Sequence, residues 1–238
     1  MLIKGFIEKI ANLQDAYKKE EVPPYDRTIL SGNVQAVITE QYRLLRSKIS
    51  GLNGNHVGRT FAITSTKNGE GKSLTAVNLA IVMAEDAKKK ILLIDGDMRK
   101  PSIHTFFNCK GEYGLADLLS NRCDIDSAVS PSGIKNLTLL LAGGPLESPS
   151  DLIATPLLKE IIEKLKKRFD YIIIDSPPII PFADMNILSD IVEGVLLVVR
   201  AEKTPKEMIL EALKSLNKEN VIGVVFNDSK KKMAKMYY

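Results

Sequence analysis

Residues 61–73 read Phe-Ala-Ile-Thr-Ser-Thr-Lys-Asn-Gly-Glu-Gly-Lys-Ser, an apolar run that leads into a glycine-rich loop. Phe61 to Ser65 has the composition of a buried strand, and an apolar helix is predicted from Lys72 to Glu85. Gly69 and Gly71 allow the backbone to turn its N–H groups toward an anion at the start of that helix. The order of strand, loop and helix therefore predicts a phosphate-binding loop in an α/β protein.

The side chains at the end of this loop suit a magnesium nucleotide. Lys72 is placed to reach the β and γ phosphates, and Ser73 is placed to ligate Mg²⁺. The predicted nucleotide contacts of the loop are Gly69, Glu70, Gly71, Lys72, Ser73 and Leu74. The strict pattern has glycine where this chain has Thr66, so the loop is a variant. A structural turn with a capping serine is the alternative, and the acidic residues downstream argue against it.

Further apolar runs alternate with helical patterns along the chain. They predict strands at Ile91 to Asp95, Leu137 to Leu141, Tyr171 to Asp175, Val195 to Val199 and Val221 to Phe226. Helices are predicted from about Val34 to Ile49 and around the apolar stripe from Leu157 to Leu165, whose other side is charged. Apolar runs without polar alternation are typical of parallel strands that are covered on both faces. The prediction is a P-loop NTPase-like α/β fold with a mostly parallel central sheet and helices on both faces.

Polar residues stand at the predicted strand ends, where ligands bind in open sheets of this kind. Asp175 ends one strand and is a candidate to hold Mg²⁺ directly or through water, with an N-cap or turn role as the alternative. Asn227 ends another strand, where it either hydrogen-bonds an adenine edge or serves as a turn residue. Arg200 also falls at a strand end and joins the predicted nucleotide-binding set.

Asp95 and Asp97 form a second acidic pair at the mouth of a strand. In an extended chain both would point the same way, although Gly96 can bend the chain and separate them. One carboxylate suffices for the metal, and the other can accept a proton from an incoming hydroxyl. Asp95, Asp97 and Lys72 are the predicted catalytic residues; Asp97 is assigned to the metal and Asp95 to the base, and the sequence leaves the reverse assignment of the two acids open. Arg99 or Lys100 is expected to steady phosphate charge. The alternative is that both acids serve magnesium and turn geometry, as in a plain ATPase.

Composition narrows the class of protein. The 238 residues contain 45% apolar residues and fit one globular domain, and 33 basic against 29 acidic residues give no argument for nucleic acid. Cys109 and Cys123 lack a CxxC spacing, which favours reduced thiols in a cytoplasmic protein. Because the chain has only two histidines, no structural metal site is expected. No apolar run approaches the roughly 20 residues of a membrane span, and no signal peptide is recognised.

Three segments organise the chain. Residues 1–33 are predicted to hold an amphipathic helix from Leu2 to Leu13, which docks on its own domain or on a partner, and then a linker. Residues 34–229 form the nucleotide-binding domain. Residues 230–238 form a basic tail that ends in two tyrosines, Tyr237 and Tyr238.

Three motifs together resemble those of the bacterial tyrosine kinases, the cytoplasmic partners of polysaccharide co-polymerases. The variant loop resembles a Walker A motif, Ile-Asp-Gly-Asp-Met-Arg-Lys-Pro at residues 94–101 resembles Walker A′, and Asp-Ser-Pro-Pro at residues 175–178 resembles Walker B. The resemblance runs from about Glu40 to the end of the chain. It implies ATP or ADP with Mg²⁺, transfer of phosphate to tyrosine, and control of capsular or extracellular polysaccharide synthesis.

Two further features carry this resemblance. Glu40, Arg43 and Arg46 match the Glu-x2-Arg-x2-Arg motif with which these kinases assemble rings, although a Glu40 to Arg43 pair within one exposed helix is the alternative. Tyr237 and Tyr238 echo the family's tyrosine-rich tail and imply autophosphorylation in trans. The family tail usually carries a longer, spaced cluster of tyrosines, so this tail departs from the pattern.

The resemblance also implies partners. A separate transmembrane activator is expected to complete the ATP site with its cytoplasmic tail and to hold the chain at the membrane, and a tyrosine phosphatase and other protein substrates are further candidates. Two other functions stay open. Lys67 sits at the signature lysine of partitioning and cell-division ATPases, which are switches that phosphorylate no protein. A nucleotide-gated adaptor that binds a membrane protein through the Leu2 to Leu13 helix is the non-enzymatic alternative.

Overall fold

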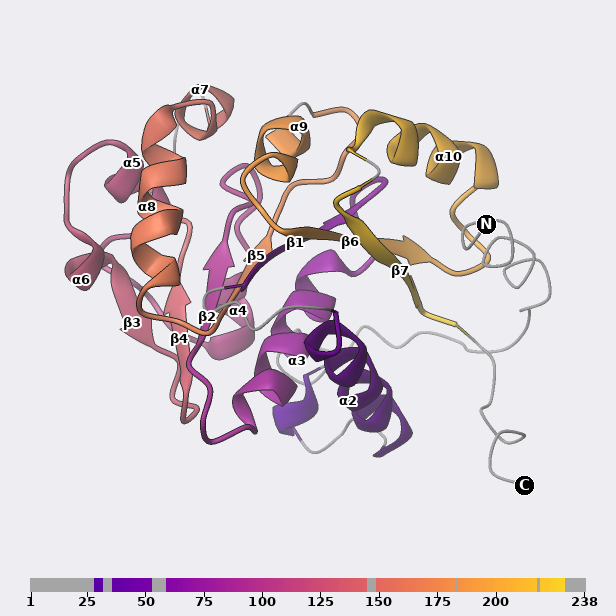
Figure 1. Ribbon diagram of the computed structural model, residues 1–238, viewed down its shortest axis with the longest axis horizontal. Helices are drawn as coiled ribbons and strands as arrows, with labels where there is room; N and C mark the ends of the chain where they lie inside the picture. The colour runs from indigo at the N-terminus through magenta and orange to yellow at the C-terminus, as the bar shows by residue number, and fades with distance from the viewer. Residues whose placement is uncertain are drawn as a thin grey trace.

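The computed structural model describes residues 28–31, 36–52, 59–144, 149–182, 184–217 and 219–229. Its core is a seven-stranded sheet between two layers of helices (Figure 1). The predicted helix from Leu2 to Leu13 and the tail with Tyr237 and Tyr238 lie outside the described residues. The three predicted segments of the chain therefore stay predictions at both ends.

The sheet has the strand order β3-β4-β2-β5-β1-β6-β7, and every neighbouring pair is parallel except β3 and β4. The strands are β1 (Arg59–Ser65), β2 (Ile91–Asp95), β3 (Val129–Pro131), β4 (Leu137–Leu140), β5 (Tyr171–Asp175), β6 (Gly194–Arg200) and β7 (Val221–Asn227). The predicted strands are confirmed to within two residues at each end. The sequence did not predict β3, because three residues that end in proline are too short to show a strand pattern.

The helices divide between the two faces of the sheet. They are η2 (Ile29–Ser31, a short 3-10 turn), α2 (Ala36–Ser50), α3 (Lys72–Ala84), α4 (Ile103–Phe107), α5 (Leu115–Leu119), α6 (Ile125–Ala128), α7 (Pro149–Ile153), α8 (Pro156–Lys166), α9 (Asp184–Ser189) and α10 (Lys206–Ser215). Core contacts place α2, α3 and α4 on one face, and α5, α7, α8, α9 and α10 on the other. The prediction of helices on both faces is confirmed.

Burial explains why the helices differ in sequence. Helix α8 buries one stripe, formed by Leu158, Ile161, Ile162 and Leu165, and leaves its remaining sides to solvent. Helix α3 is apolar nearly all round, because the sheet covers one side of it and α2 packs on another. A helix covered on several sides has no polar face to display, so α3 lacks a clear amphipathic period.

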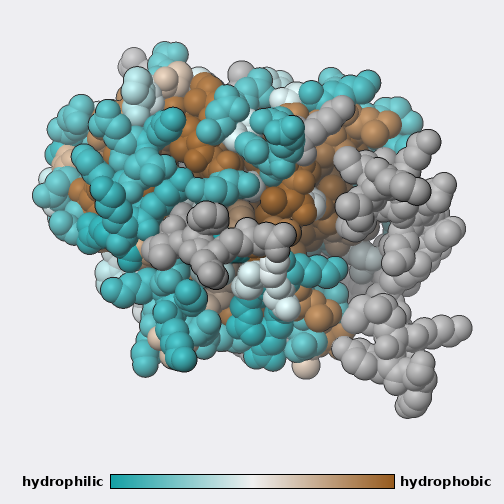
Figure 2. All heavy atoms as spheres, viewed as in Figure 1, coloured by the Kyte–Doolittle hydropathy of each residue, from teal (hydrophilic) through white to brown (hydrophobic). Residues whose placement is uncertain are grey.

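The central strands supply side chains to both cores. In β2, Ile91 and Leu93 pack toward α3, while Leu92 and Ile94 pack toward α8, and all four are buried. The edge strand β7 is half-buried along its whole length. Figure 2 shows apolar residues in the middle of one face, where β6 and β7 lie in Figure 1, and hydrophilic residues over α8. Within the described part of the chain, no helix has the length and apolar character to cross a membrane.

Candidate nucleotide and phosphoryl-transfer site

The carboxyl ends of three adjacent strands meet at one edge of the sheet. Strand β5 lies between β1 and β2, and Asp95 at the end of β2 is in register with Asp175 at the end of β5. The glycine-rich loop follows β1 at the same edge and leads into α3. Parallel strands therefore bring together the loop and both acidic motifs that the sequence predicted to be neighbours.

The conformation of the loop depends on its glycines. Gly69 and Gly71 have φ angles of 82° and 93°, in the left-handed region that favours glycine. A Cβ atom at Gly71 would lie 1.8 Å from Nδ2 of Asn227, so a side chain is excluded there by contact as well as by conformation. Helix α3 begins directly after Gly71, and its first N–H groups are therefore available to an anion held by the loop.

Lys72 lies among the acidic side chains of the site. Its Nζ is 2.7 Å from Oδ2 of Asp97 and 3.5 Å from Oδ1 of Asp175, and 3.3 Å from the hydroxyl of Ser73. Burial lowers the pKa of Lys72, but the negative charges of Asp175 and Asp97 outweigh burial and raise the pKa above its usual value. Lys72 is thus a buried cation, and the structure brings together four residues predicted for phosphate and metal.

Asp95 points to a different partner. The backbone bends at Gly96, whose N–H donates to the carbonyl of Asp175 at 2.7 Å, and the two acids separate there. Oδ2 of Asp95 accepts the N–H groups of Ser102 and Ile103, each at 2.9 Å, and so holds the start of α4. Of the two geometries that the spacing allowed, the structure has the bent one. Asp97 pairs with Lys72, and Asp95 accepts hydrogen bonds from the backbone at the start of α4.

Both strand-end acids are proton-binding groups near neutral pH. Burial raises the pKa of Asp175 to about 7, against the opposing charge of Lys72. Burial also raises the pKa of Asp95 to about 6, against the N–H groups of Ile103 and Ser102. Oδ1 of Asp95 and Oδ2 of Asp175 are buried and have no hydrogen-bond partner in the described part of the chain. Buried carboxylate oxygens without a donor are suited to a cation or a proton.

These residues fit Mg²⁺ bound together with a nucleotide. Within the ranges that the structure describes, no three His, Cys, Asp or Glu side chains form a metal cluster. Mg²⁺ in nucleotide sites usually takes one or two carboxylates and completes its shell with phosphates and water. Ser73, Asp97 and Asp175 with its unpartnered Oδ2 provide such a partial set.

The buried Asp175 predicts how stability depends on pH. Its pKa rises from 3.8 to about 7 on folding, so the native state keeps a proton that the unfolded chain releases between these values. The free energy of unfolding therefore falls as the pH rises through this window. Between about pH 5 and pH 8 the free energy of unfolding should fall less in Asp175→Asn than in the wild type, by at least about 1 kcal/mol. Urea unfolding without nucleotide or magnesium measures this, and an unchanged slope in the variant contradicts it.

Four predicted nucleotide contacts, in or near the loop, are engaged with the protein itself. The amide of Asn227 donates to the carbonyl oxygen of Glu70 at 2.9 Å, and the Glu70 side chain is turned inward and buried. Arg200 forms an ion pair with Asp228, with Nη2 2.6 Å from the carboxylate. Leu74 packs against the core. The nucleotide-binding roles of these residues stay predictions, and Glu70 is placed to offer its backbone rather than its side chain.

Arg99 has a role that the sequence did not reveal. Its Nε is 3.0 Å from Oδ2 of the buried Asp184, its Cζ lies 4.4 Å from the ring centre of Phe182, and it also hydrogen-bonds Ser150. The hydroxyl of Ser150 donates to Asp184 at 2.5 Å. These contacts tie the loop after β2 to α7 and α9, and the expectation that Arg99 or Lys100 steadies phosphate stays a prediction. No motif marks these distant partners in the sequence.

The Glu-x2-Arg-x2-Arg residues lie on α2, and both arginines contact the end of α3. Arg43 is 3.0 Å from Glu85 and 3.6 Å from Glu40, and Arg46 is 3.0 Å from Glu85. Arg46 also donates to the carbonyl of Val82. Cations at a helix C-terminus are favourable, so these contacts help to dock α2 on α3. The Glu40 to Arg43 pair that was the alternative exists, but Arg43 lies closer to Glu85 than to Glu40, and Arg46 pairs with Glu85 as well.

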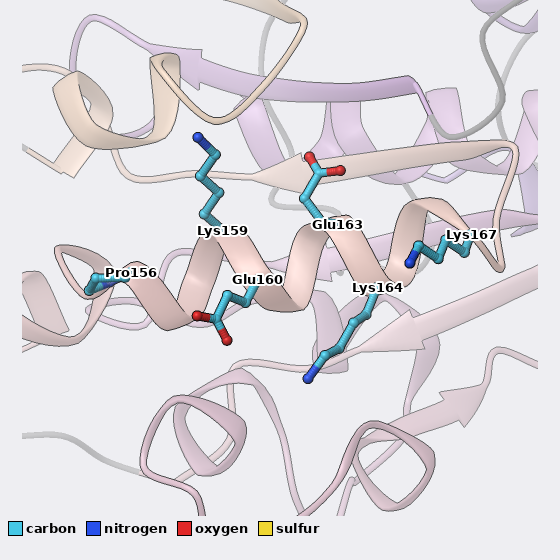
Figure 3. Close-up of a pocket in the computed structure, with 6 residues that line it drawn as sticks. All are labelled: Pro156, Lys159, Glu160, Glu163, Lys164 and Lys167. Atoms are coloured by element: carbon cyan, nitrogen blue, oxygen red, sulfur yellow. The ribbon is translucent and has the colours of Figure 1, made fainter.

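A surface pocket lies on α8, away from the strand ends. It is lined by Pro156, Lys159, Glu160, Glu163, Lys164 and Lys167. In Figure 3 these charged side chains project from the helix in different directions, Lys159 and Glu163 on one side and Glu160 and Lys164 on the other. Charges of both signs on exposed stems are typical of a solvated helix face, as predicted for this segment.

Comparisons with known proteins agree with the geometry of the site. Residues 58–222 match a family model described as AAA domain. The chain is 37% identical to the tyrosine-protein kinase YwqD of Bacillus subtilis (strain 168) over 194 residues, which cover 81% of each protein. The chain belongs to the bacterial tyrosine kinases. Both the predicted enzyme class and the predicted P-loop fold are confirmed.

Solved structures place this tyrosine kinase within the wider P-loop fold. The chimerical protein CapA2B2 superposes with a TM-score of 0.80 at 28% identity, over 94% of this kinase and 97% of that chain. The cell division ATPase MinD of Pyrococcus furiosus superposes with a TM-score of 0.60 at 26% identity, over 71% of each. The kinase therefore shares the core of its fold with a cell division ATPase and superposes over nearly all of its length on CapA2B2.

Proposed function

We propose that this kinase uses MgATP to phosphorylate the tail tyrosines Tyr237 and Tyr238 of a neighbouring copy. The observation that carries the proposal is the pair of acids at one strand end. Asp97 forms an ion pair with Lys72 of the phosphate loop. Asp95 keeps one oxygen without a hydrogen-bond partner in the described part of the chain, and its pKa is raised to about 6. A plain ATPase needs no base for an alcohol, whereas transfer to tyrosine benefits from one.

Each residue then has a defined task. Lys72 holds the β and γ phosphates, and Ser73, Asp97 and Asp175 hold the metal. When bound, Mg²⁺ neutralises charge on the phosphates during transfer. Asp95 accepts the proton of the tyrosine hydroxyl as the phenolic oxygen bonds to the γ phosphorus and the bond from that phosphorus to the bridging oxygen breaks. The products are phosphotyrosine, ADP and protonated Asp95.

Assembly and activation follow from the family resemblance. We propose a ring of copies joined through Glu40, Arg43 and Arg46, in which the tail of one copy enters the site of the next. A separate transmembrane activator would complete the ATP site and hold the kinase at the cytoplasmic side of the membrane, where it regulates capsular or extracellular polysaccharide synthesis. A tyrosine phosphatase and further protein substrates complete the proposed set of partners.

Ring assembly is expected to depend on the arginines of α2. Arg43→Ala with Arg46→Ala should convert rings to monomers, because both guanidinium groups are lost, whereas Lys48→Ala on the same helix should leave assembly unchanged. Light scattering after size-exclusion chromatography measures both. Glu85→Ala removes the partner of both arginines within the chain but keeps the arginines, so it separates the docking of α2 on α3 from ring assembly. Rings that persist in the double variant would show that the arginines serve only to dock α2 on α3.

A switch ATPase without protein phosphorylation is the second candidate function. Lys67 and the similarity to MinD favour it. The two functions differ in the fate of the γ phosphate, which the kinase transfers to tyrosine and the switch releases to water. Labelled MgATP, supplied with the activator's cytoplasmic segment, distinguishes them. Label on tyrosine that persists in Lys67→Ala supports the kinase, and label released only as phosphate, with a requirement for Lys67, supports the switch.

A further inference from the structure

The carboxylate of Glu70 lies inside the phosphate loop and is 1% exposed. Its Oε2 accepts the N–H of Thr66 at 2.8 Å, the hydroxyl of Thr66 at 2.6 Å and the N–H of Lys67 at 3.2 Å. Thr66 is the residue that replaces the glycine of the strict loop pattern, and its hydroxyl is used in this contact. The first half of the loop is therefore held from within by one carboxylate oxygen.

The other oxygen of Glu70 reaches a separate segment. Oε1 accepts the hydroxyl of Thr204, which lies between β6 and α10. The same hydroxyl oxygen accepts the N–H of Arg200 at 3.1 Å, at the end of β6. Glu70 thus joins the loop after β1 to the turn after β6.

The end of β7 closes this network. Asn227 donates its side-chain amide to the carbonyl of Glu70 at 2.9 Å, and its own carbonyl accepts the N–H of Ala201 at 2.8 Å. Its amide nitrogen occupies the space that a side chain at Gly71 would need. The ends of β1, β6 and β7 are consequently connected through one buried glutamate.

We infer that Glu70 is a positioning residue for nucleotide binding, an inference that rests on the proposed nucleotide site. A buried carboxylate next to a phosphate-binding loop is electrostatically unfavourable for an anionic ligand, so its charge is not what the site requires. Its geometry is useful, because two acceptor oxygens satisfy donors on two sides at once. By taking the N–H groups of Thr66 and Lys67, Glu70 fixes the turn from which the later N–H groups of the loop face the phosphates.

Calorimetric titration with MgADP tests this inference on the full chain. Glu70→Ala leaves several buried donors unpaired, and we expect it to weaken MgADP binding at least about tenfold. Glu70→Gln keeps one acceptor for Thr66 and Lys67, and we expect affinity within about threefold of the wild type. Glu207→Ala, which removes an exposed acid at the start of α10, is the matched control and should bind as the wild type does.

Thr204→Val extends the test if Glu70→Ala fails to fold. It removes only the hydroxyl that Oε1 of Glu70 accepts, and we expect it to weaken MgADP binding about threefold. A wild-type chain that does not bind MgADP would overturn the proposed nucleotide site. Wild-type affinity in a folded Glu70→Ala, or in Thr204→Val if Glu70→Ala does not fold, would overturn the inference about Glu70 and leave that site intact.

Discussion

Replacing Lys72 by methionine is expected to lower the rate of phosphoryl transfer by about a hundredfold or more. In the described part of the chain, Lys72 is the buried cation that pairs with Asp97 and Asp175, and no other buried cation does so. Methionine keeps much of the length of the side chain and removes its charge. The phosphates then lose their cation, while the two acids remain. Initial rates of tyrosine labelling from MgATP, at saturating activator, measure the effect.

The matched control is Lys67→Met in the same loop. Lys67 is exposed, so its loss should leave tyrosine labelling within about twofold of the wild type. Lys72→Met also leaves buried acids without a counter-charge, which destabilises the fold most at high pH, where those acids are ionised. Folding of the variant is therefore checked at the pH of the assay. Full activity in a folded Lys72→Met protein would remove Lys72 from the proposed mechanism.

Asp95→Asn is expected to lower the maximal rate of tyrosine labelling by about a hundredfold while leaving MgADP binding nearly unchanged. Asparagine keeps an oxygen that accepts the N–H groups of Ser102 and Ile103, so the start of α4 stays in place. It removes the proton acceptor. Asp95→Ala removes both functions and should also lower the free energy of unfolding by about 1 to 3 kcal/mol, since two N–H groups lose their partner.

Asp97→Asn provides the comparison within the same motif. Asp97 holds Lys72 and is proposed to hold the metal, so its loss should weaken MgADP binding as well as transfer. If Asp95→Asn retained wild-type transfer and Asp97→Asn alone abolished it, the base would be Asp97, and Asp95 would act only on α4. The proposed roles therefore require that Asp95→Asn changes only the chemical step and that Asp97→Asn also changes MgADP binding.

The backbone of this kinase was predictable where short apolar runs were bounded by motifs. The strands β2 and β5 begin and end at the predicted residues, because each is a continuous apolar run that ends in aspartate. Strand β3 and the short helices α4 to α7 were not predicted, because elements of three to five residues carry too little periodic signal.

The contents of the site were predictable and their partners were not. A phosphate loop after β1, an acidic pair at the end of β2 and an acid at the end of β5 must meet at one edge of a parallel sheet, so Lys72, Asp97 and Asp175 could be placed together. Whether Asp95 joined them depended on the bend at Gly96, which spacing alone leaves open. The inward turn of Glu70 and the pairing of Arg99 with Asp184 depend on side-chain packing between distant segments, for which the sequence has no local pattern.

Peptide mapping by mass spectrometry tests most directly whether this kinase transfers phosphate to the tail of a neighbouring copy. The full chain is incubated with MgATP and the activator's cytoplasmic segment, in parallel with Lys72→Met, and the C-terminal peptide is examined. We predict phosphate on Tyr237, Tyr238 or both in the wild type and none in Lys72→Met. An unmodified C-terminal peptide, from a wild-type sample that has consumed ATP under these conditions, would contradict the account.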